Sequence, residues 1–229
     1  MMTMKKPTDG LGAYAPRRSA ERPLPLLTPS RTAQQYRIRA DLVGAQPPLW
    51  RRVTLASDLT LDRMHGVLQA AFGWTDSHLH QFAVATGRAQ LRTEAILSPF
   101  DVDEGESGVP ESTLRLDQLL GTTGDKLYYT YDFGDDWQHV LKLEAIAPLT
   151  KTDAAARCIG GRRRGAPEDV GGIYFYDELL AAAGDPDHPD LEHLTEMIED
   201  LGLWDFDDRI DLDEINAALS WSVTDSQNR

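Results

Sequence analysis

The sequence predicts an α+β fold: an antiparallel sheet of hairpins packed by an amphipathic helix, with a helical, acidic C-terminal part. Between residues 36 and 146, apolar and polar residues alternate as they do in half-buried strands. One amphipathic stretch interrupts these strands, and three helical stretches end the chain. Because the strands come first and the helices mostly later, the order differs from the strict alternation of a Rossmann fold.

The predicted strands fall into hairpins. YRIRADLV (36–43) and LWRRVTL (49–55) are joined by a turn with two prolines, and HLHQFAVAT (78–86) forms a further strand. LYYTYDF (127–133) and QHVLKLEAI (138–146) flank GDDW. A short segment rich in Gly and Asp between alternating runs is typical of a hairpin turn.

The first helix is predicted between the second and third strands. LTLDRMHGVLQAAFGW (59–74) places its apolar residues at helical spacing. Thr60 is expected to cap the free amides at the start, and Gly73 to end the helix in a left-handed conformation. We expect this helix to pack on the sheet, and residues 101–112 to form an acidic loop.

Three helices are predicted in the C-terminal part, at roughly 173–183, 190–201 and 211–220. Asp211 can cap the last of them, with Glu214 three residues later in the capping-box position. The stretch 185–214 holds thirteen acidic residues and one basic residue. Acids at helical spacing form either a solvated helix face or a docking surface for a basic partner.

Charge and composition exclude several classes of protein. The chain has 229 residues and a net charge of −14, which excludes a simple basic nucleic-acid coat protein and argues against an anionic membrane as a partner. Its one cysteine, Cys158, forms no internal disulfide and suits a reducing, cytoplasmic location. No apolar run reaches the roughly 18 residues of a membrane span, and the start has no signal-peptide pattern.

One domain is predicted between two flexible ends. Residues 1–33 contain five of the thirteen prolines, six basic and two acidic residues, and are expected to be a disordered basic arm. Residues 34–222 are expected to form a single α+β domain, and 223–229 a tail. The positive arm leaves a net charge of −18 on the rest. This charge opposes direct nucleic-acid binding by the body and leaves such binding to the arm.

The first candidate site is His78-Leu79-His80. On a strand, residues two apart point to the same face at about 6.5–7 Å, close enough for both imidazoles to reach one metal ion. A divalent metal would take further ligands from Asp135 and His139 of the next hairpin. The alternative interpretation is structural, with one ring capping Trp74 or a turn and the other bound to a backbone carbonyl.

The second candidate is the turn YDFGDDWQHV. Asp132, Asp135, Asp136 and His139 offer hard oxygen ligands with a nitrogen beside them. Asp also favours turns for local reasons, since its carboxylate accepts hydrogen bonds from backbone amides two residues on. Trp137 is either a core anchor or an aromatic platform at a pocket rim.

The third candidate is GGRRRGAPEDVGG, which precedes a predicted helix. Arg162, Arg163 and Arg164, with free amides near a helix N-terminus, are able to hold an anion. Glu168 and Asp169 complete the candidate ligand-binding residues. In the alternative interpretation the loop is mobile, and these two acids stabilise the start of the helix. The segment matches neither a Walker loop nor GxGxxG.

The motifs together resemble a known family. LWRRV, a helix ending in FGW, HLHQF, YTYDFGDDWQHVLKLE and PEDVGG follow one another as in the plasmid pRiA-type open-reading-frame-three-like family, which is also described as TnpR-like passenger proteins of insertion elements. The resemblance covers residues 34–185 and implies an α+β fold without a settled activity. The residues at matching motif positions are His78, His80, Asp132, Asp135, Asp136, Trp137, His139, Cys158, Glu168 and Asp169.

The chain departs from this family pattern in one loop. Members often carry a cysteine and a second proline where this chain has Gly165 and Ala166, so the resemblance implies no two-cysteine metal or redox site here. The TnpR label suggests recombination, yet no serine nucleophile stands among arginines near the start. We therefore do not expect recombinase activity.

Three functions follow from these candidates. The first is a non-catalytic binding module that recognises a protein or small polar ligand at a rim where the HLH strand, the GDDW turn and the PEDVGG loop converge. The second is a divalent-metal-dependent hydrolase or nuclease, in which His78, His80 and the hairpin aspartates hold the ion that activates water. The third is nucleic-acid binding through the basic arm.

Overall fold

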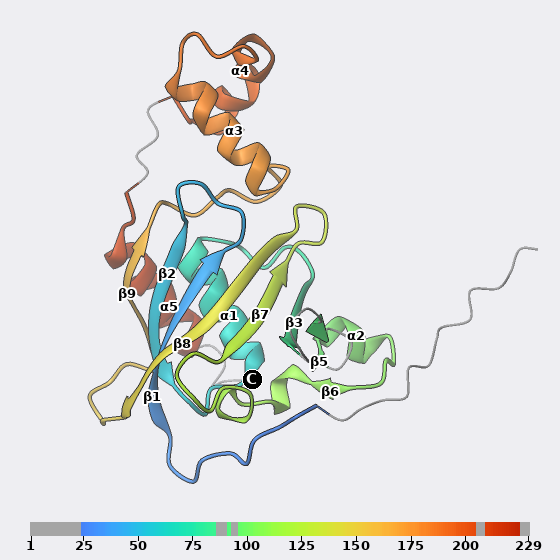
Figure 1. Cartoon of the computed structure of the whole chain (residues 1–229), viewed down its shortest axis with the longest axis vertical. Coiled ribbons are helices and arrows are strands. Elements are labelled where there is room, and N and C mark those ends of the chain that lie inside the picture. Colours follow the sequence, from blue (N-terminus) through green and yellow to red (C-terminus); the bar gives the residue numbers. More distant parts are fainter. Residues whose placement is uncertain (1–23, 86–90, 93–95, 205–208, 225–229) are drawn as a thin grey trace, which may run out of the picture.

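A seven-stranded sheet, antiparallel at every pairing, forms the centre of the molecule, with the strand order β4-β3-β7-β8-β1-β2-β9 (Figure 1). The computed structural model describes residues 24–85, 91–92, 96–204 and 209–224. The sheet strands are β1 (Gln34–Leu42), β2 (Trp50–Ala56), β3 (His80–Ala85), β4 (Leu91–Arg92), β7 (Lys126–Tyr131), β8 (Trp137–Pro148) and β9 (Ala156–Arg162). The predicted α+β class and antiparallel sheet are confirmed.

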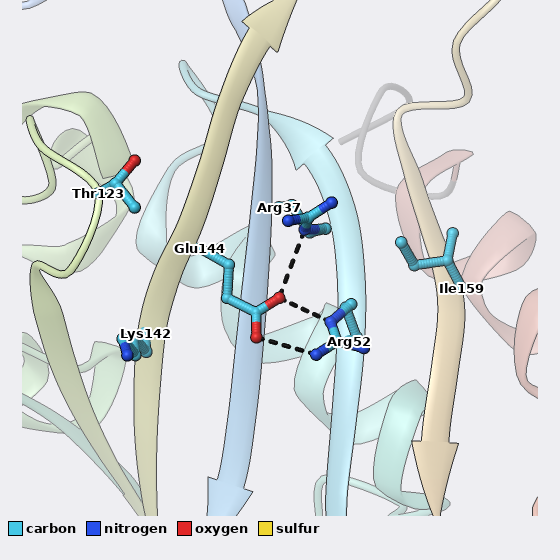
Figure 2. A pocket seen from close by; sticks show the side chains of 6 residues that line it. All are labelled: Arg37, Arg52, Thr123, Lys142, Glu144 and Ile159. Atoms are coloured by element: carbon cyan, nitrogen blue, oxygen red, sulfur yellow. Dashed lines mark hydrogen bonds and ion pairs between the residues drawn. The ribbon is translucent and has the colours of Figure 1, made fainter.

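Helices α1 (Leu61–Phe72) and α5 (Leu212–Thr224) cover one face of the sheet and pack on each other (Figure 1). Leu61, Met64 and Leu68 of α1 are fully buried, and burial of each such side chain contributes roughly 1.5–3 kcal/mol. The other face bears the polar side chains of the alternating strands, and Figure 2 shows part of it in front of the strands. No helix of the described residues covers that face in Figure 1.

The helix ends follow the predictions in part. Gly73 ends α1 with φ of 83°, as expected for a left-handed C-cap. Thr60 stands at the N-cap of α1, but its side chain makes no capping hydrogen bond. Asp211 Oδ1 accepts hydrogen bonds from the amides of Asp213 (2.9 Å) and Glu214 (3.0 Å), so the predicted cap of α5 is confirmed.

Helices α3 (Ile173–Gly184) and α4 (Leu191–Asp200) lie beyond one end of the sheet (Figure 1). Asp177 of α3 fastens them to the β1–β2 loop, because its carboxylate accepts from Gln46 N and from Arg163 Nη2, both at 2.8 Å. Arg163 is 4% exposed and also donates to Pro47 O. Arg163 is therefore a buried tether of α3 and not part of an anion-binding loop.

The N-terminal boundary differs from the prediction. Leu24 is buried, Leu27 N donates to Gln118 O (2.8 Å) and Ser30 N to Asp117 Oδ2 (3.1 Å). Residues 24–33 thus lie along the domain and do not belong to a disordered arm. Residues 1–23 and 225–229, which hold the rest of the predicted arm and tail, lie outside the described residues.

Two segments that were predicted as loops form regular structure. The acidic loop contains α2 (Pro99–Asp103), which begins with a capping box between Ser98 and Asp101, and it is flanked by the parallel pair β5 (Ile96–Leu97) and β6 (Val109–Pro110). Strand β9 escaped prediction because it contains Gly160 and Gly161, which are uncommon in strands. A Cβ at Gly161 would lie 2.9 Å from Trp50 O, so this strand requires glycine there.

No helix among the described residues is both long enough and apolar enough to cross a lipid bilayer.

Candidate functional site

Three loops meet at one end of the sheet: the α1–β3 loop (73–79), the β7–β8 turn (132–136) and the β9–α3 loop (163–172). Trp74 Nε1 donates to Ala166 O at 2.9 Å, and Gly171 N donates to Asp135 Oδ2 at 3.1 Å. A Cβ on Gly172 would lie 2.5 Å from Asp135 O. The predicted convergence is therefore present for the GDDW and PEDVGG segments, and of the two HLH histidines only His78 joins them.

Glu168 joins these loops. Its carboxylate accepts hydrogen bonds from Thr75 N (3.1 Å), Thr75 Oγ1 (2.7 Å), Ser77 Oγ (3.1 Å) and the hydroxyl of Tyr131. Burial raises the pKa of Glu168, but the hydrogen bonds from Tyr131, Thr75 and Ser77 outweigh it and hold that pKa below its ordinary value. Burial, together with Glu168, raises the pKa of Tyr131 to about 12. Glu168 is thus a structural acceptor that joins the loops, and it does not stabilise the start of α3 as the alternative interpretation held.

His78 does not lie on a strand. Strand β3 begins at His80, and the amides of Ser77 and His78 both donate to the Tyr131 hydroxyl, at 3.0 and 3.3 Å. The chain is therefore bent at this point, and the rule that residues two apart face the same way does not apply. His78 and His80 enter two different clusters, and the single metal site predicted from them is not formed.

The first cluster, here called the loop cluster, consists of His78, Asp132 and Asp169. His78 Nε2 lies 3.2 Å from Asp169 Oδ1 and 3.7 Å from Asp132 Oδ2. The three ligand atoms lie within 4.8 Å of one another. His78 Nε2 is screened from solvent and makes no hydrogen bond within the described residues, while the Asp169 side chain is 75% exposed. The cluster therefore opens to solvent through Asp169.

The backbone holds the two carboxylates of the loop cluster in place. Asp132 (φ 53°) and Asp169 (φ 60°) are in the left-handed region, which Asp tolerates better than most residues. Asp132 Oδ1 accepts from Gly134 N at 2.9 Å. This bond directs the other carboxylate oxygen of Asp132 toward His78.

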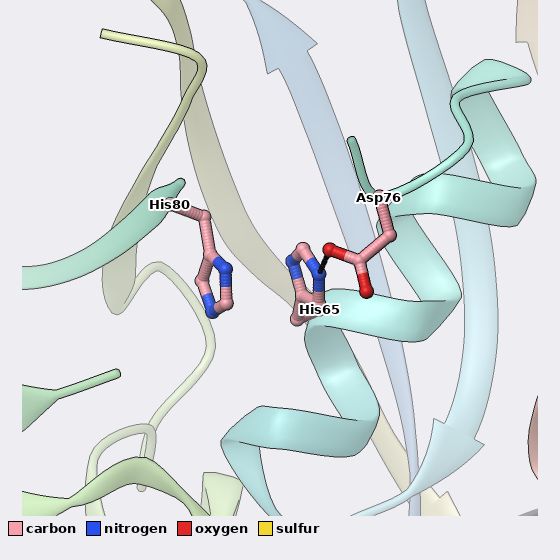
Figure 3. Close-up of side chains that lie close together, drawn as sticks. All are labelled: His65, Asp76 and His80. Carbon is pink, nitrogen blue, oxygen red and sulfur yellow. Dashed lines mark hydrogen bonds and ion pairs between the residues drawn. The ribbon is translucent and has the colours of Figure 1, made fainter. Parts of the chain in front are cut away.

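The second cluster, here called the buried cluster, consists of His65, Asp76, His80 and Glu111. The rings of His65 and His80 are stacked, with centroids 3.6 Å apart and an angle of 11° between the planes (Figure 3). His80 Nε2 lies 3.0 and 3.1 Å from the two carboxylate oxygens of Glu111. Both histidines and Glu111 are less than 9% exposed, so this cluster is closed to solvent on most sides.

The hydrogen bonds around His65 form a closed circuit. Asp76 N donates to Gln69 Oε1 (2.9 Å), and Gln69 Nε2 donates to the Tyr129 hydroxyl (3.1 Å). Tyr129 then donates to His65 Nδ1 (2.8 Å), and His65 Nε2 donates to Asp76 Oδ1 (2.8 Å). The bond from His65 lowers the pKa of Asp76. Every ring nitrogen of His65 is already used, so a metal ion would have to break this circuit.

The other residues predicted for the turn have separate roles. Trp137 is fully buried, so it is a core anchor and offers no platform at a rim. His139 is 1% exposed, its Nδ1 is bound to Trp137 O (2.9 Å), and burial lowers its pKa to about 3. Asp135 accepts from Gly171 N, and Asp136 accepts from Gln138 Nε2 (2.7 Å). The structure does not bring Asp135 and His139 to one ion with His78 and His80.

The arginine loop and the cysteine offer no site of the predicted kind. Arg163 is buried, whereas Arg162 and Arg164 are exposed, so the three guanidinium groups do not face one anion. Cys158 is 1% exposed, burial raises the pKa of its thiol, and its amide donates to Asn216 Oδ1 on α5 (2.8 Å). Cys158 is therefore a packing residue of β9.

Sequence reasoning missed the buried cluster. His65 lies four residues after Leu61 on the apolar face of α1, and a polar residue at an apolar position of a helix was the available signal. Glu111 lies in the predicted acidic loop, and only its 3% exposure distinguishes it from its neighbours. No local pattern placed these two residues beside His80.

The fold and the loop cluster define an α+β protein with a His/carboxylate site on the loops at one end of an antiparallel sheet. The family model for the plasmid pRiA4b ORF-3-like protein matches residues 34–214. The chain belongs to this family, as its motifs predicted.

Two relatives extend this result. The uncharacterised protein y4hQ of Sinorhizobium fredii is 34% identical in an alignment of 182 residues that covers 76% of this chain and 84% of the relative. The fold is similar to the crystal structure of MM3350, a protein of unknown function from Methanosarcina mazei Go1, with a TM-score of 0.66 and 30% identity over 80% of this chain and 98% of the other. Membership of this uncharacterised family thus supports the fold and leaves the activity to the chemistry of the site.

Proposed function

We propose that the protein is a binding module whose loop cluster holds a divalent cation and, through it, a small polar ligand with an anionic group. The observation that carries this proposal is His78 Nε2, which is screened from solvent, makes no hydrogen bond within the described residues and faces two carboxylates at 3.2 and 3.7 Å. One imidazole and two carboxylates suit ions such as Zn²⁺ or Mn²⁺. Three protein ligands leave coordination positions for a bound ligand.

The neighbouring acids favour binding over hydrolysis. A hydrolytic metal site uses a further carboxylate or histidine as a base or to orient the attacking water. Asp135 is engaged with Gly171 N, and Glu168 with Thr75, Ser77 and Tyr131. Neither acid is therefore placed as a free base beside the loop cluster.

Calorimetric titration with Zn²⁺ and with Mn²⁺ tests the proposal. The full chain is purified without a His tag, and bound metal is removed before the titration. We expect one site that His78→Ala and Asp132→Asn each weaken at least 10-fold, since even an outer partner of a metal ligand is commonly worth about 10–100-fold. His193→Ala, an exposed histidine of α4, is the matched control and should leave the affinity unchanged.

Two results contradict the proposal. Cation binding that is equally tight in the wild type and in both variants would place the ion outside the loop cluster. If the metal-loaded chain hydrolysed p-nitrophenyl phosphate and His78→Ala abolished that activity, the site would be catalytic, and the hydrolase interpretation would replace the binding module.

A further inference from the structure

The sheet face opposite α1 and α5 carries a row of positive charge. In the register of the sheet, Lys126 pairs with Lys142, Lys142 with Arg39, and Arg39 with Arg52. Directly paired residues of neighbouring strands point to the same face and lie about 5 Å apart. Four cations from β7, β8, β1 and β2 therefore form one row across four adjacent strands, which we call the cation row.

The cation row costs stability, which its surroundings offset only in part. Like charges opposite each other on a sheet are destabilising. The chain has 37 acidic residues, yet all four positions of this row carry a positive charge. Glu144 binds Arg52 at 2.6 Å, and Asp41 binds Arg39 at 2.7 Å. Lys126 and Lys142 form no ion pair within 4.0 Å in the part of the chain that the structure describes. The lysine half of the row thus presents uncompensated charge.

A hollow lies over part of the row, with Arg52 and Lys142 in its lining. Its volume is about 660 Å³, and Figure 2 shows the Arg37 and Arg52 side chains turned toward Glu144 within it. This volume is in the usual range for ligand sites, about 300–1,000 Å³. The lining residues are Arg37, Arg52, Thr123, Lys142, Glu144 and Ile159.

The next row on the same face, here called the aromatic row, contains two aromatic side chains, Tyr128 and Trp50, with Val140 and Asp41 between them. Tyr128 pairs with Val140, and Asp41 pairs with both Val140 and Trp50, two positions along the strands from the cation row. The guanidinium groups of Arg39 and Arg52 lie 4.4 and 4.9 Å from the Trp50 ring centroid, so Trp50 positions both arginines. Tyr128 is half-buried and stacks on no other ring among the described residues.

We propose that this face binds single-stranded nucleic acid, with phosphates on the cation row and a base on Tyr128. A charged track beside aromatic side chains is the arrangement that single-stranded nucleic acids require, because the backbone takes the charge and each base offers a face for stacking. An acidic protein segment would use the cations and leave the aromatic row without a role. This inference is independent of the cation at the loop cluster, and it places nucleic-acid binding on the body, where the net charge alone disfavours it.

Fluorescence anisotropy with the full chain and a labelled mixed-sequence single-stranded DNA of about 12 nucleotides tests this proposal. The titration is run in EDTA, so that its outcome does not depend on the loop cluster. We expect affinity to fall steeply with salt. Lys126→Gln combined with Lys142→Gln should weaken binding about 10-fold or more at 50 mM salt, because two phosphate contacts are lost. Each lost contact should also reduce the slope of log affinity against log salt concentration by about 0.7. Tyr128→Leu should weaken binding about fivefold or more.

Lys151→Gln, at an exposed residue of the loop after β8, is the control for the loss of one lysine charge, and it should change affinity less than about twofold. DNA binding that survives the double lysine variant would be carried by another part of the chain and would overturn the proposal. Equal affinity for a duplex of the same length would overturn the single-strand assignment. Binding of poly-glutamate in place of DNA would identify an acidic protein as the partner instead.

Discussion

The two histidine clusters contain the same chemical groups but differ in how the histidine ring nitrogens are hydrogen-bonded. In the buried cluster both ring nitrogens of His65 are hydrogen-bonded, and His80 lies against both oxygens of Glu111. In the loop cluster His78 Nε2 faces two carboxylates without a hydrogen bond within the described residues. The comparison shows that residue types alone do not identify a binding site. A polar atom that folding leaves without a hydrogen bond and that also faces other ligand groups is the better indication.

The difference follows from where the residues stand in the fold. His65 is inside α1 and His80 is the first residue of β3, so both are held by regular elements and surrounded by the core. The loop cluster takes all three of its residues from connections between elements. Connections lie at the surface and carry binding groups more often than the elements they join.

Tyr129→Phe should break the buried cluster and give the largest effect. The change keeps the ring and leaves His65 Nδ1 and Gln69 Nε2 without a partner, and each such buried group costs about 1–3 kcal/mol. Urea unfolding should therefore show a loss of about 2–5 kcal/mol, with cation binding at the loop cluster unchanged. Tyr128→Phe, on the exposed side of the same strand, is the control. A loss below about 0.5 kcal/mol would mean that the circuit contributes little.

His139 should give the steepest pH dependence on the buried side. Its ring packs against Tyr129, and burial lowers its pKa to about 3, whereas in the unfolded chain it titrates near 6.5. Between these values only the unfolded state binds the proton, so stability falls as pH falls. We expect His139 to account for a loss of about 2 kcal/mol between pH 7 and pH 5.

Urea unfolding of His139→Phe over the same pH range measures this contribution, because the variant lacks the titrating group and its stability should depend less on pH. His193→Phe, at an exposed position, should keep the slope of the wild type. If the wild type and His139→Phe have the same slope, His139 accepts its proton without loss of the native structure.

Glu168→Gln should reduce cation binding at the loop cluster and leave the hydrogen bonds of the buried cluster unchanged. The neutral amide is a poorer acceptor for Thr75, Ser77 and Tyr131, and we expect a loss of about 1–2 kcal/mol at pH 7 and weaker cation binding. Because the pKa of Glu168 is lowered in the native state, its contribution is present above about pH 4.3 and is lost as pH falls through the native pKa.

The variant should therefore lose less stability than the wild type between pH 5 and pH 3. Glu178→Gln, an exposed acid of α3, is the control for the loss of one negative charge. Cation binding that is unaffected in Glu168→Gln would show that the loop cluster keeps its shape without the Glu168 bonds.

Lys142→Gln should give the smallest change in stability. It extends the comparison from the two histidine clusters to the cation row, whose lysines form no ion pair within the described residues. Because the lysine stands between Lys126 and Arg39 in the register, its removal relieves repulsion. Thermal unfolding should show no loss, and at most a gain of about 0.5 kcal/mol at low salt. A destabilisation as large as that of Glu168→Gln would mean that the cation row is structural. Lys151→Gln again serves as the control.

Much of the fold was predictable because its signals are local. The alternation in β1, β2, β7 and β8, the period of α1 and the GDDW turn all appear within a few residues of each other. Strand β9 was missed because its two glycines carry no side-chain pattern, and the contact that requires glycine at 161 comes from Trp50 of a distant strand. The cation row was not predictable from the sequence, because Lys126 lies opposite Lys142 only when Tyr131 pairs with Trp137, and the sequence pattern had placed Trp137 in the turn.

The candidate site was predictable in its parts and not in its grouping. His78, Asp132 and Asp169 were each singled out, and the structure does bring them together. Their separation from His80 depends on the bend before β3, which the Tyr131 hydroxyl stabilises from another strand. Contacts of this kind join residues about 50 positions apart, and no pattern within a short window contains them.

The loop that carries Asp169 is held at both ends and in the middle. Arg163 binds Asp177 at one end, α3 begins directly after the other, and Glu168 is bound between them. The conformational entropy of this segment is thus lost during folding, before any ligand arrives. An incoming ion therefore meets one imidazole nitrogen and two carboxylates on a backbone that is already ordered, and little further conformational entropy of this loop should be lost on binding.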